Sequence, residues 1–286
     1  MKEGKERGKV VVRKQDLIEG FIKLELKKCG LVMVHSSLSS FGYVVGGAKT
    51  VIESLLEIID EGTLVFPTFT FSTIDSERPP FNPKKTPSVV GEITEVFWRQ
   101  GYGLRSHHPT HSIAAKGKDA EELIKNHEKF TPFSFEGPFG KIYKSGGYIL
   151  LLGVDCEVIS FFHAIEEWVK LPYLFPTKAK IEVNGKIEIV EVPLHPPGHR
   201  RFKNITDRLE KDGKVKKVLI GNALCKLFSV RELVEYTVKM MEKKPDILLR
   251  SDCLCEFCSL ARKFTYHIFK ENGLILPYKK FKEIYG

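Results

Sequence analysis

Three short, largely apolar runs, each leading through polar or glycine-rich residues into a helical pattern, constrain the fold more than any other feature of this sequence. The runs are Leu31–Val34, Thr63–Phe66 and Tyr148–Leu152. Short apolar runs bounded by turn residues are typical of strands buried on both faces. Helical patterns alternate with them, at 16–28, 48–59, 89–99, 119–126 and 160–170. This alternation predicts an α/β fold with a parallel or mixed sheet covered on both faces.

The chain is expected to form a single domain over residues 1–286. Nothing between residues 60 and 200 resembles a linker, and α/β domains of this size are often undivided. Residues 1–9 are predicted to be a frayed start, and about 245–286 a helical, cysteine-containing appendage. Asn184–Gly185 predicts the turn of a hairpin. Beyond residue 192 we expect a more helical chain, with helices at 205–212, 230–243 and 259–270, and earlier long loops at 68–88 and 130–140.

The charge balance narrows the class of partner. The 45 Lys and Arg residues outnumber the 36 Asp and Glu residues, which gives a net charge of +9. This excludes an acidic disordered protein and is compatible with an anionic partner such as nucleic acid or a phosphorylated cofactor. The basic residues are scattered among acids except at 211–217, and no nucleic-acid-binding module is recognised. Nucleic acid is therefore the weaker alternative, against a solvated charged surface.

Targeting and cysteine usage point to the cytoplasm. No apolar run reaches the roughly 18 residues needed to span a bilayer, and 10–13 is too short for a signal-peptide core. Three of the six cysteines lie in 253–258, which favours metal or thiol chemistry over disulfides. Cys255 and Cys258 have the CxxC spacing of metal ligands, and His195 and His199 lie upstream. A zinc site and a set of reduced thiols both fit this pattern.

Two polar segments carry possible anion or metal contacts. The first runs from His35 to Gly47, where paired glycines open a helix whose N–H groups could hold a phosphate. An ordinary strand–helix connection explains the same residues. The second, Leu104–Ser112, concentrates one Arg, three His and three hydroxyls. It could bind phosphate through Arg105, bind a metal, or be a solvated loop.

A third segment offers acid–base chemistry. His163 and Glu166 lie three residues apart on a predicted helix, and therefore on one face. A carboxylate beside an imidazole raises its basicity and fixes its tautomer, as a general base requires. The helix follows the run at 148–152, and open α/β sheets place their sites at the carboxyl ends of strands. A surface or core contact without function remains the alternative reading.

Taken in order, these segments resemble the aminoglycoside 3-N-acetyltransferase family over roughly residues 15–260. The resemblance rests on Val34-His-Ser-Ser-Leu38, Val45-Gly-Gly47, Gly62-Thr-Leu-Val-Phe-Pro-Thr68, Arg105-Ser-x-His-Pro-Thr110, Ser134 to Gly140, Leu150-Leu-Leu-Gly153 and His163-x-x-Glu166. Ile220 to Phe228 and Cys255-x-x-Cys258 resemble a subgroup with a cysteine-bearing C-terminus.

The resemblance implies a three-layer α/β/α fold with a mixed, mainly parallel sheet, unlike that of the commoner acetyltransferases. It implies acetyl-CoA as the donor, a primary amine on an aminocyclitol sugar as the acceptor, and direct transfer with His163 as the base. The carboxylates expected near the cationic acceptor are Glu166, Glu167 and Asp75. The residues expected to hold coenzyme are His35, Ser36, Ser37, Leu38, Val45, Gly46, Gly47, Arg105, Ser106, Thr110 and Ser112.

Further expectations concern metal, assembly and substrate. We expect a structural zinc held by His199, Cys253, Cys255 and Cys258, and leave a homodimer open. Where drug-modifying members carry an acidic residue after the hairpin, this chain has Pro193 to His199. The 68–88 loop is also short of acids, so a natural amine metabolite fits as well as an antibiotic. The alternative enzyme is a zinc-dependent hydrolase using His107, His108 and His111, with or without His163.

Overall fold

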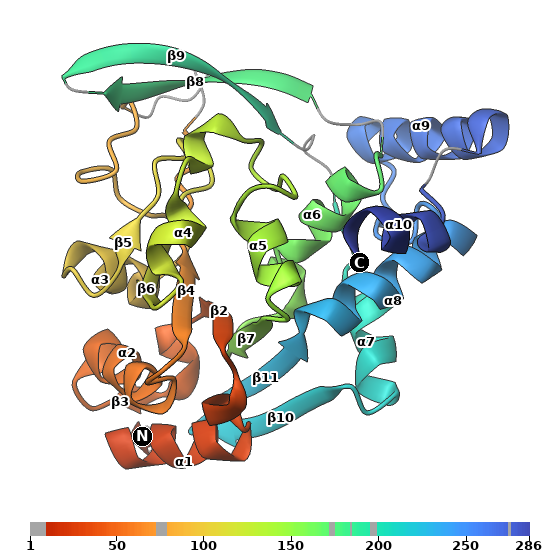
Figure 1. Ribbon diagram of the computed structural model, residues 1–286. Helices are drawn as coiled ribbons and strands as arrows, with labels where there is room; N and C mark the ends of the chain where they lie inside the picture. The colour runs from red at the N-terminus through yellow and green to blue at the C-terminus, as the bar shows by residue number, and fades with distance from the viewer. Residues whose placement is uncertain (1–9, 73–78, 172–174, 184, 195–198, 274–275) are drawn as a thin grey trace, which may run out of the picture.

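The computed structural model describes residues 10–72, 79–171, 175–183, 185–194, 199–273 and 276–286. A seven-stranded sheet forms its centre (Figure 1). In spatial order the strands are β10 (Val215–Ile220), β11 (Ala223–Ser229), β7 (Tyr148–Leu152), β2 (Leu31–Ser36), β4 (Thr63–Pro67), β6 (Ile113–Gly117) and β5 (Leu104–Arg105). The three runs that the sequence marks as buried strands are therefore the three adjacent central strands.

Strand direction changes from the centre of the sheet to its edges. Strand β2 pairs in parallel with β4 on one side and with β7 on the other. The other four pairings are antiparallel. The sheet is thus mixed, as predicted, but its parallel part is limited to β7, β2 and β4, so the expectation of a mainly parallel sheet is wrong. Within each outer pair the connection is short, from β5 to β6 and from β10 to β11, and antiparallel pairing allows this without a crossover helix.

Helices cover both faces of the sheet, which confirms the three-layer α/β/α architecture. Alternate side chains of β2 point to opposite cores, with Val32 and Val34 in one and Leu31 and Met33 in the other. The first core is closed by α1 (Lys14–Lys23), α2 (Gly47–Ile58) and α3 (Glu92–Arg99). The second is closed by α4 (Ala120–Ile124), α5 (Pro138–Lys144), α6 (Phe161–Trp168), α7 (Lys203–Lys211), α8 (Val230–Lys243) and α10 (Tyr278–Tyr285).

Two elements differ from the sequence expectation. Strands β10 and β11 form an antiparallel hairpin at 215–229, which the expectation of a more helical chain beyond residue 192 did not include. Strand β10 lies at the edge of the sheet, and several of its side chains face solvent. Its sequence therefore lacks the regular apolar alternation typical of a strand. Helix α5 begins inside the predicted loop 130–140, with Pro138 in its first turn. Proline suits a first helical turn because no intrahelical partner is needed there for its missing N–H.

The predicted hairpin is present and longer than expected. Strands β8 (Phe175–Val183) and β9 (Lys186–Leu194) pair antiparallel and lie across one end of the molecule (Figure 1). Phe81, in the long loop, exchanges backbone hydrogen bonds with the hairpin at Lys180 and Glu182, both at 2.8 Å. A separate two-stranded parallel sheet joins β1 (Val11–Val12) to β3 (Tyr43–Val44).

The C-terminal region contains α9 (Glu256–Asn272) and α10. Helix α10 returns to the domain, because Phe281 is fully buried and its ring lies 6.3 Å from that of Tyr143. A single domain stays a prediction, as does the frayed start, which lies outside the described residues. Among the helices of the described ranges, none combines the length and the apolar character needed to cross a bilayer.

Gly140 in α5 supplies a stability prediction. A Cβ at this position would lie 1.7 Å from the carbonyl oxygen of Phe135, which is backbone and cannot turn away. We expect Gly140→Ala to lower the free energy of unfolding by about 3 kcal/mol or more and the melting temperature by roughly 5–10 °C. Gly30→Ala is the matched control, because its Cβ would meet no atom within 4 Å. Equal melting temperatures for the two variants would contradict the close approach.

Candidate active site

A cavity of about 370 Å³ opens at the carboxyl ends of the parallel strands. The chain leaves β2 toward α2 on one face of the sheet and leaves β7 toward α6 on the other. In open α/β sheets such a reversal produces the crevice in which ligands bind. The lining residues are His35, Ser36, Pro67, Phe69, Phe71, Val90, His111, Phe133, Val154, Glu157, Val158, Ile159, Ser160, His163 and Phe202.

His163 reaches this cavity from the first turn of α6. Its Nδ1 lies 2.9 Å from Oε2 of Glu166, one turn along the same helix, and 28% of its side chain is exposed. The predicted pair is thus formed, with the imidazole at the cavity wall. Ser160 lines the cavity as well, and its side chain makes no capping hydrogen bond to α6.

Glu166 has a second partner that sequence reasoning missed. Nε of Arg200 donates to Oε1 of Glu166 at 2.9 Å, and the exposed fractions of the two side chains are only 7% and 0%. One carboxylate therefore joins a guanidinium to an imidazole at a cavity wall. The two residues are 34 positions apart in the sequence, so no local spacing could reveal the pair. The available signal was an arginine beside the predicted zinc ligand His199.

His35 and Ser36 lie at the end of β2 and line the cavity, as predicted. Within the described part of the chain, Nε2 of His35 and Oγ of Ser36 are buried without a hydrogen-bond partner. Burial lowers the pKa of His35 to about 4, so the ring is neutral at neutral pH. A bound molecule is a suitable partner for such buried polar atoms.

The glycine turn opens α2 as expected. Gly46 and Gly47 have φ angles of 80° and 63°, and a Cβ at Gly46 would lie 2.2 Å from Oγ1 of Thr50. These positive angles favour glycine. The Thr50 hydroxyl donates to the carbonyl of Val45 at 2.7 Å, which ties the turn to the helix. The first N–H groups of a helix lack intrahelical partners, so the turn suits an anion. Ser37 and Leu38 are half-buried between β2 and this turn.

The residues predicted from the 104–112 segment bind other protein groups. The Arg105 guanidinium donates to Thr68, Ser112 and Thr86, and packs against the ring of Trp98 at 4.3 Å. The Ser106 hydroxyl lies 2.9 Å from Nδ1 of His127, and the hydroxyls of Thr110 and Ser112 lie 2.8 Å from Nδ1 of His111 and from the Thr68 carbonyl oxygen. These contacts stabilise a segment that presents His111 to the cavity. Direct contact with a coenzyme stays a prediction.

The three histidines of this segment are not arranged as a metal site. His107 is exposed, whereas His108 and His111 are buried. Nδ1 of His108 accepts the backbone N–H of His111 at 3.0 Å. Burial lowers the pKa of His108 to about 3, so its ring is neutral. Among the described residues, the group of side chains placed to hold a metal lies elsewhere.

The carboxylates expected near an acceptor are dispersed. Glu167 is held by the hydroxyl of Thr131, and burial raises its pKa. Asp75 lies outside the described residues. Glu157 lines the cavity although the sequence analysis did not select it. Its two oxygens accept the backbone N–H groups of Phe202 and Lys203 at 2.9 and 3.1 Å. It therefore anchors the start of α7 at the cavity wall.

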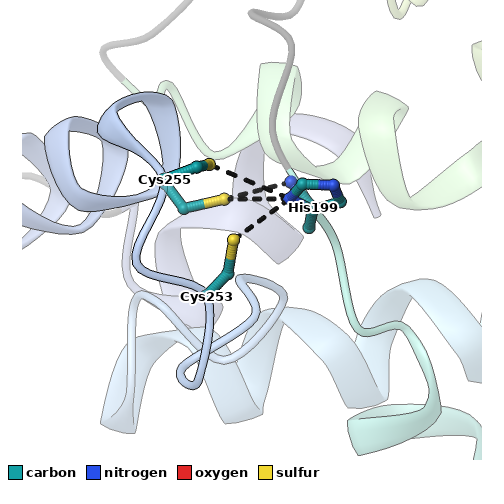
Figure 2. Close-up of side chains that lie close together, drawn as sticks. His199, Cys253 and Cys255 are labelled. Atoms are coloured by element: carbon teal, nitrogen blue, oxygen red, sulfur yellow. Dashed lines mark hydrogen bonds between the residues drawn. The ribbon is translucent and has the colours of Figure 1, made fainter.

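The structure brings together His199, Cys253, Cys255 and Cys258, which the sequence predicted as metal ligands. One ligand atom from each lies within 4.8 Å of the others. Figure 2 shows Cys253 and Cys255 pointing toward the His199 ring, and Nδ1 of His199 lies 3.1 and 3.8 Å from their sulfurs. Three thiols and one imidazole form a donor set typical of structural zinc sites.

Comparison with known proteins identifies the family. The model of the family described as aminoglycoside 3-N-acetyltransferase matches residues 33–242. The chain belongs to the aminoglycoside 3-N-acetyltransferase family. It is 31% identical to the SPbeta prophage-derived aminoglycoside N(3')-acetyltransferase-like protein YokD of Bacillus subtilis, over 79% of this chain and 91% of that protein. It is also 31% identical to aminoglycoside N(3)-acetyltransferase IV of Salmonella sp, over 83% of this chain and 90% of the relative. This chain is accordingly an acyltransferase of that kind.

Solved structures of aminoglycoside 3-N-acetyltransferases share the fold. The apoenzyme of aminoglycoside acetyltransferase AAC(3)-IVa superposes with a TM-score of 0.79 at 28% identity, over 90% of this chain and 99% of that one. The YokD structure from Bacillus subtilis gives 0.74 at 30% identity, over 82% of this chain and 94% of that one. These matches confirm that the α/β/α fold is the family's own.

Burial of His108 supplies a prediction about acid stability. A folded pKa of about 3 lies below the unfolded value near 6.5, so the unfolded chain takes up the proton first and stability falls as the pH drops below 6.5. Asparagine can accept the same backbone N–H without titrating. We expect His108→Asn to lose about 2 kcal/mol less unfolding free energy than the wild type between pH 6.5 and 4.5.

Urea unfolding followed by tryptophan fluorescence at the two pH values measures this difference. A loss of stability that is the same at both pH values does not affect it. The exposed His107 on the same loop gives the control His107→Asn, which should lose as much as the wild type. The same loss in His108→Asn would contradict a buried neutral imidazole.

Proposed function

We propose that this protein transfers the acetyl group of acetyl-CoA to a primary amine of an amino sugar or related amine metabolite, with His163 as the general base. The observation that carries the proposal is the pair of contacts that Glu166 makes with Arg200 and His163. They lie beside a cavity at the carboxyl ends of the parallel strands. Family membership supplies the reaction class, and this geometry supplies a base for it.

The imidazole matches the proton transfer that the reaction requires. A primary amine is mostly protonated at neutral pH, and only its neutral form attacks the thioester carbonyl. The carboxylate of Glu166 accepts a hydrogen bond from the Nδ1–H of His163. This contact favours the tautomer in which Nε2 carries no proton and can accept one from the substrate. Nε2 takes a proton from the nitrogen as the C–N bond forms. The C–S bond then breaks, and the same proton can pass to the departing thiolate of coenzyme A.

The glycine turn and the unpartnered polar atoms of β2 support a coenzyme with phosphates. The start of α2 offers backbone N–H groups to an anion, and Gly46 and Gly47 allow close approach. Ser36 and His35 line the same cavity as the imidazole and can orient the pantetheine arm. A protein of the same fold at 21% identity, AAC-IIIb, has been solved as a binary complex with CoASH.

The acceptor is argued from the cavity and from a relative. Aminoglycoside acetyltransferase AAC(3)-IVa, 28% identical, has been solved as mutants in complex with a gentamicin and with apramycin. Among the described residues that line this cavity, the carboxylate is that of Glu157, and it already accepts two backbone N–H groups. Most other lining side chains are apolar. We therefore favour an acceptor with fewer amines than a polycationic aminoglycoside.

The cysteine cluster is proposed to hold a structural zinc ion rather than a catalytic one. His199 and the three cysteines supply four ligands and leave no open position for a reacting water. When bound, zinc would crosslink the chain at 199 to the start of α9. No observation favours the zinc hydrolase, since His108 and His111 engage the protein through Nδ1. We place the enzyme in the cytoplasm, in keeping with its six unpaired cysteines.

The first test is thiol release from acetyl-CoA across a panel of amines. The panel contains aminoglycosides, single amino sugars and small aliphatic amines at matched concentration. We expect turnover with at least one amino sugar, and a lower KM for acceptors with one or two amines than for polycations. Absence of thiol release with every amine, or hydrolysis of acetyl-CoA at the same rate without an acceptor, would refute the proposal.

His163→Ala tests the base directly. We expect kcat to fall about 10²- to 10⁴-fold, while the Kd of coenzyme A from calorimetry stays within a factor of two to three. His107→Ala is the control, because His107 is exposed in the 104–112 segment, and it should keep wild-type kcat. A His163→Ala enzyme with wild-type kcat would exclude this residue as the base.

Metal content tests the zinc assignment. We expect about one zinc per chain by inductively coupled plasma mass spectrometry, and loss of most of it in Cys255→Ser, because three ligands bind zinc far more weakly than four. Ser251→Ala, an exposed neighbour, should keep its zinc. Equal metal content in the two variants would contradict the site.

A further inference from the structure

We propose that the zinc site positions the catalytic imidazole, through Arg200 as a positioning residue that connects the metal ligand His199 to the buried carboxylate of Glu166. The proposal rests on the assigned role of His163 and adds a structural reason for the cysteine cluster. It predicts that metal bound at the base of α9 controls kcat although none of the metal ligands lines the cavity.

The first step is that the cluster matches tetrahedral zinc. Zinc–sulfur and zinc–nitrogen bonds of about 2.3 and 2.0–2.1 Å place tetrahedral ligands about 3.6–3.8 Å apart. Nδ1 of His199 lies 3.8 Å from Sγ of Cys255 and 3.7 Å from Sγ of Cys258. The contact with Cys253 is shorter, at 3.1 Å. The backbone N–H of His199 donates to Cys258 Sγ at 3.1 Å, a contact that suits a metal-bound thiolate.

The second step is that the ligand and the positioning residue share one short segment. Arg200 follows His199 directly and forms an antiparallel bridge with Leu249. The N–H of Arg250 donates to the His199 carbonyl at 3.0 Å, and the N–H of Arg201 donates to the Leu248 carbonyl at 2.9 Å. The cysteines begin three residues beyond Arg250. The segments 199–201 and 248–250 are therefore already paired. Zinc bound to His199 and the cysteines would fix residue 199 relative to residues 253–258.

The third step leads from this segment into the active site. The Arg200 side chain is 7% exposed and reaches Glu166, whose side chain is fully buried. Oε1 of Glu166 accepts from Arg200 and Oε2 from His163, so the two contacts together fix the carboxylate rotamer. Two residues further on, the N–H of Phe202 donates to Glu157 in the cavity lining. The segment that carries the zinc ligand thus contacts the cavity wall at two places.

The physical consequence follows from the burial of Glu166. A buried carboxylate that loses its guanidinium is strongly destabilised and turns toward whatever donors remain. The imidazole then loses a fixed partner, and small misplacements of a catalytic group are costly in rate. Outer-shell contacts to metal ligands typically change affinity or activity about 10- to 100-fold. We expect an effect of that size on kcat, with little change in substrate binding.

The experiment combines two changes, zinc removal and Arg200→Ala, and compares their separate and joint effects on kcat. Wild type and Arg200→Ala are each assayed zinc-loaded and after chelator treatment, with metal content and far-UV circular dichroism recorded for all four samples. Zinc removal should lower wild-type kcat at least about 10-fold and leave both KM values within a factor of about three. In Arg200→Ala, zinc removal should change kcat less than about threefold, because the connection is already broken.

Two variants on the zinc-loaded enzyme complete the test without any metal removal. Arg200→Lys keeps the charge and should recover part of the kcat lost in Arg200→Ala. Arg201→Ala is the matched control, since its neighbouring guanidinium pairs with the exposed Asp252 instead, and it should keep wild-type kcat. Cobalt substitution gives a readout independent of activity: thiolate-to-cobalt absorption should be equal in wild type and Arg200→Ala, because Arg200 is not a ligand.

Several outcomes would overturn the connection. Multiplicative losses from zinc removal and Arg200→Ala, an unchanged kcat after zinc removal, or no metal in the purified protein each contradict it. If zinc-free protein loses its circular dichroism, a wild-type kcat in zinc-loaded Arg200→Ala is the contradicting result. These outcomes are separable from failure of the proposed function, since His163→Ala with wild-type kcat refutes the base whatever zinc does.

Discussion

The arrangement around His163 depends on the buried carboxylate of Glu166. A fully buried carboxylate needs charged or hydrogen-bonding partners on both oxygens, because its desolvation otherwise makes the ionised form unfavourable. Here the partners are the imidazole of His163 and the guanidinium of Arg200, each at 2.9 Å. The requirement ties α6, through Glu166, to Arg200, which lies 34 residues later in the sequence. The same contact gives the imidazole the tautomer and orientation that the proposed general base requires.

The sheet explains why this pair lies beside a cavity. Strands β2 and β7 are parallel neighbours, yet the chain leaves them toward opposite faces of the sheet. The segments that follow the two strands therefore diverge, and the cavity lies between them. His35 and Ser36 enter that cavity from β2, and His163 enters it from the helix after β7. Residues far apart in sequence therefore converge on one cavity.

Burial divides the polar residues of the chain into two kinds. Arg105, Ser106, Thr110 and Ser112 were selected as coenzyme contacts by residue type, but each bonds to protein in the structure. Their hydrogen bonds satisfy polar groups that the fold buries, and so hold the segment carrying His111. Arginine and hydroxyl side chains can bind a phosphate or can form hydrogen bonds with buried polar groups of the protein. Residue type alone therefore could not distinguish the two roles. By contrast, Nε2 of His35 and Oγ of Ser36 are buried without a hydrogen-bond partner among the described residues, and both residues line the cavity.

The sequence by itself determined the central strands, most of the helices, the His163–Glu166 pair and the four residues that we propose as zinc ligands. These follow from local periodicity, from i, i+3 geometry and from CxxC spacing, which depend only on near neighbours along the chain. Only the tertiary structure decided the antiparallel edge hairpin β10–β11, the cavity position of Glu157 and the contact between Arg200 and Glu166. Each depends on which distant segment lies alongside. No local pattern encodes that, because pairing and burial are settled by the packing of the whole chain.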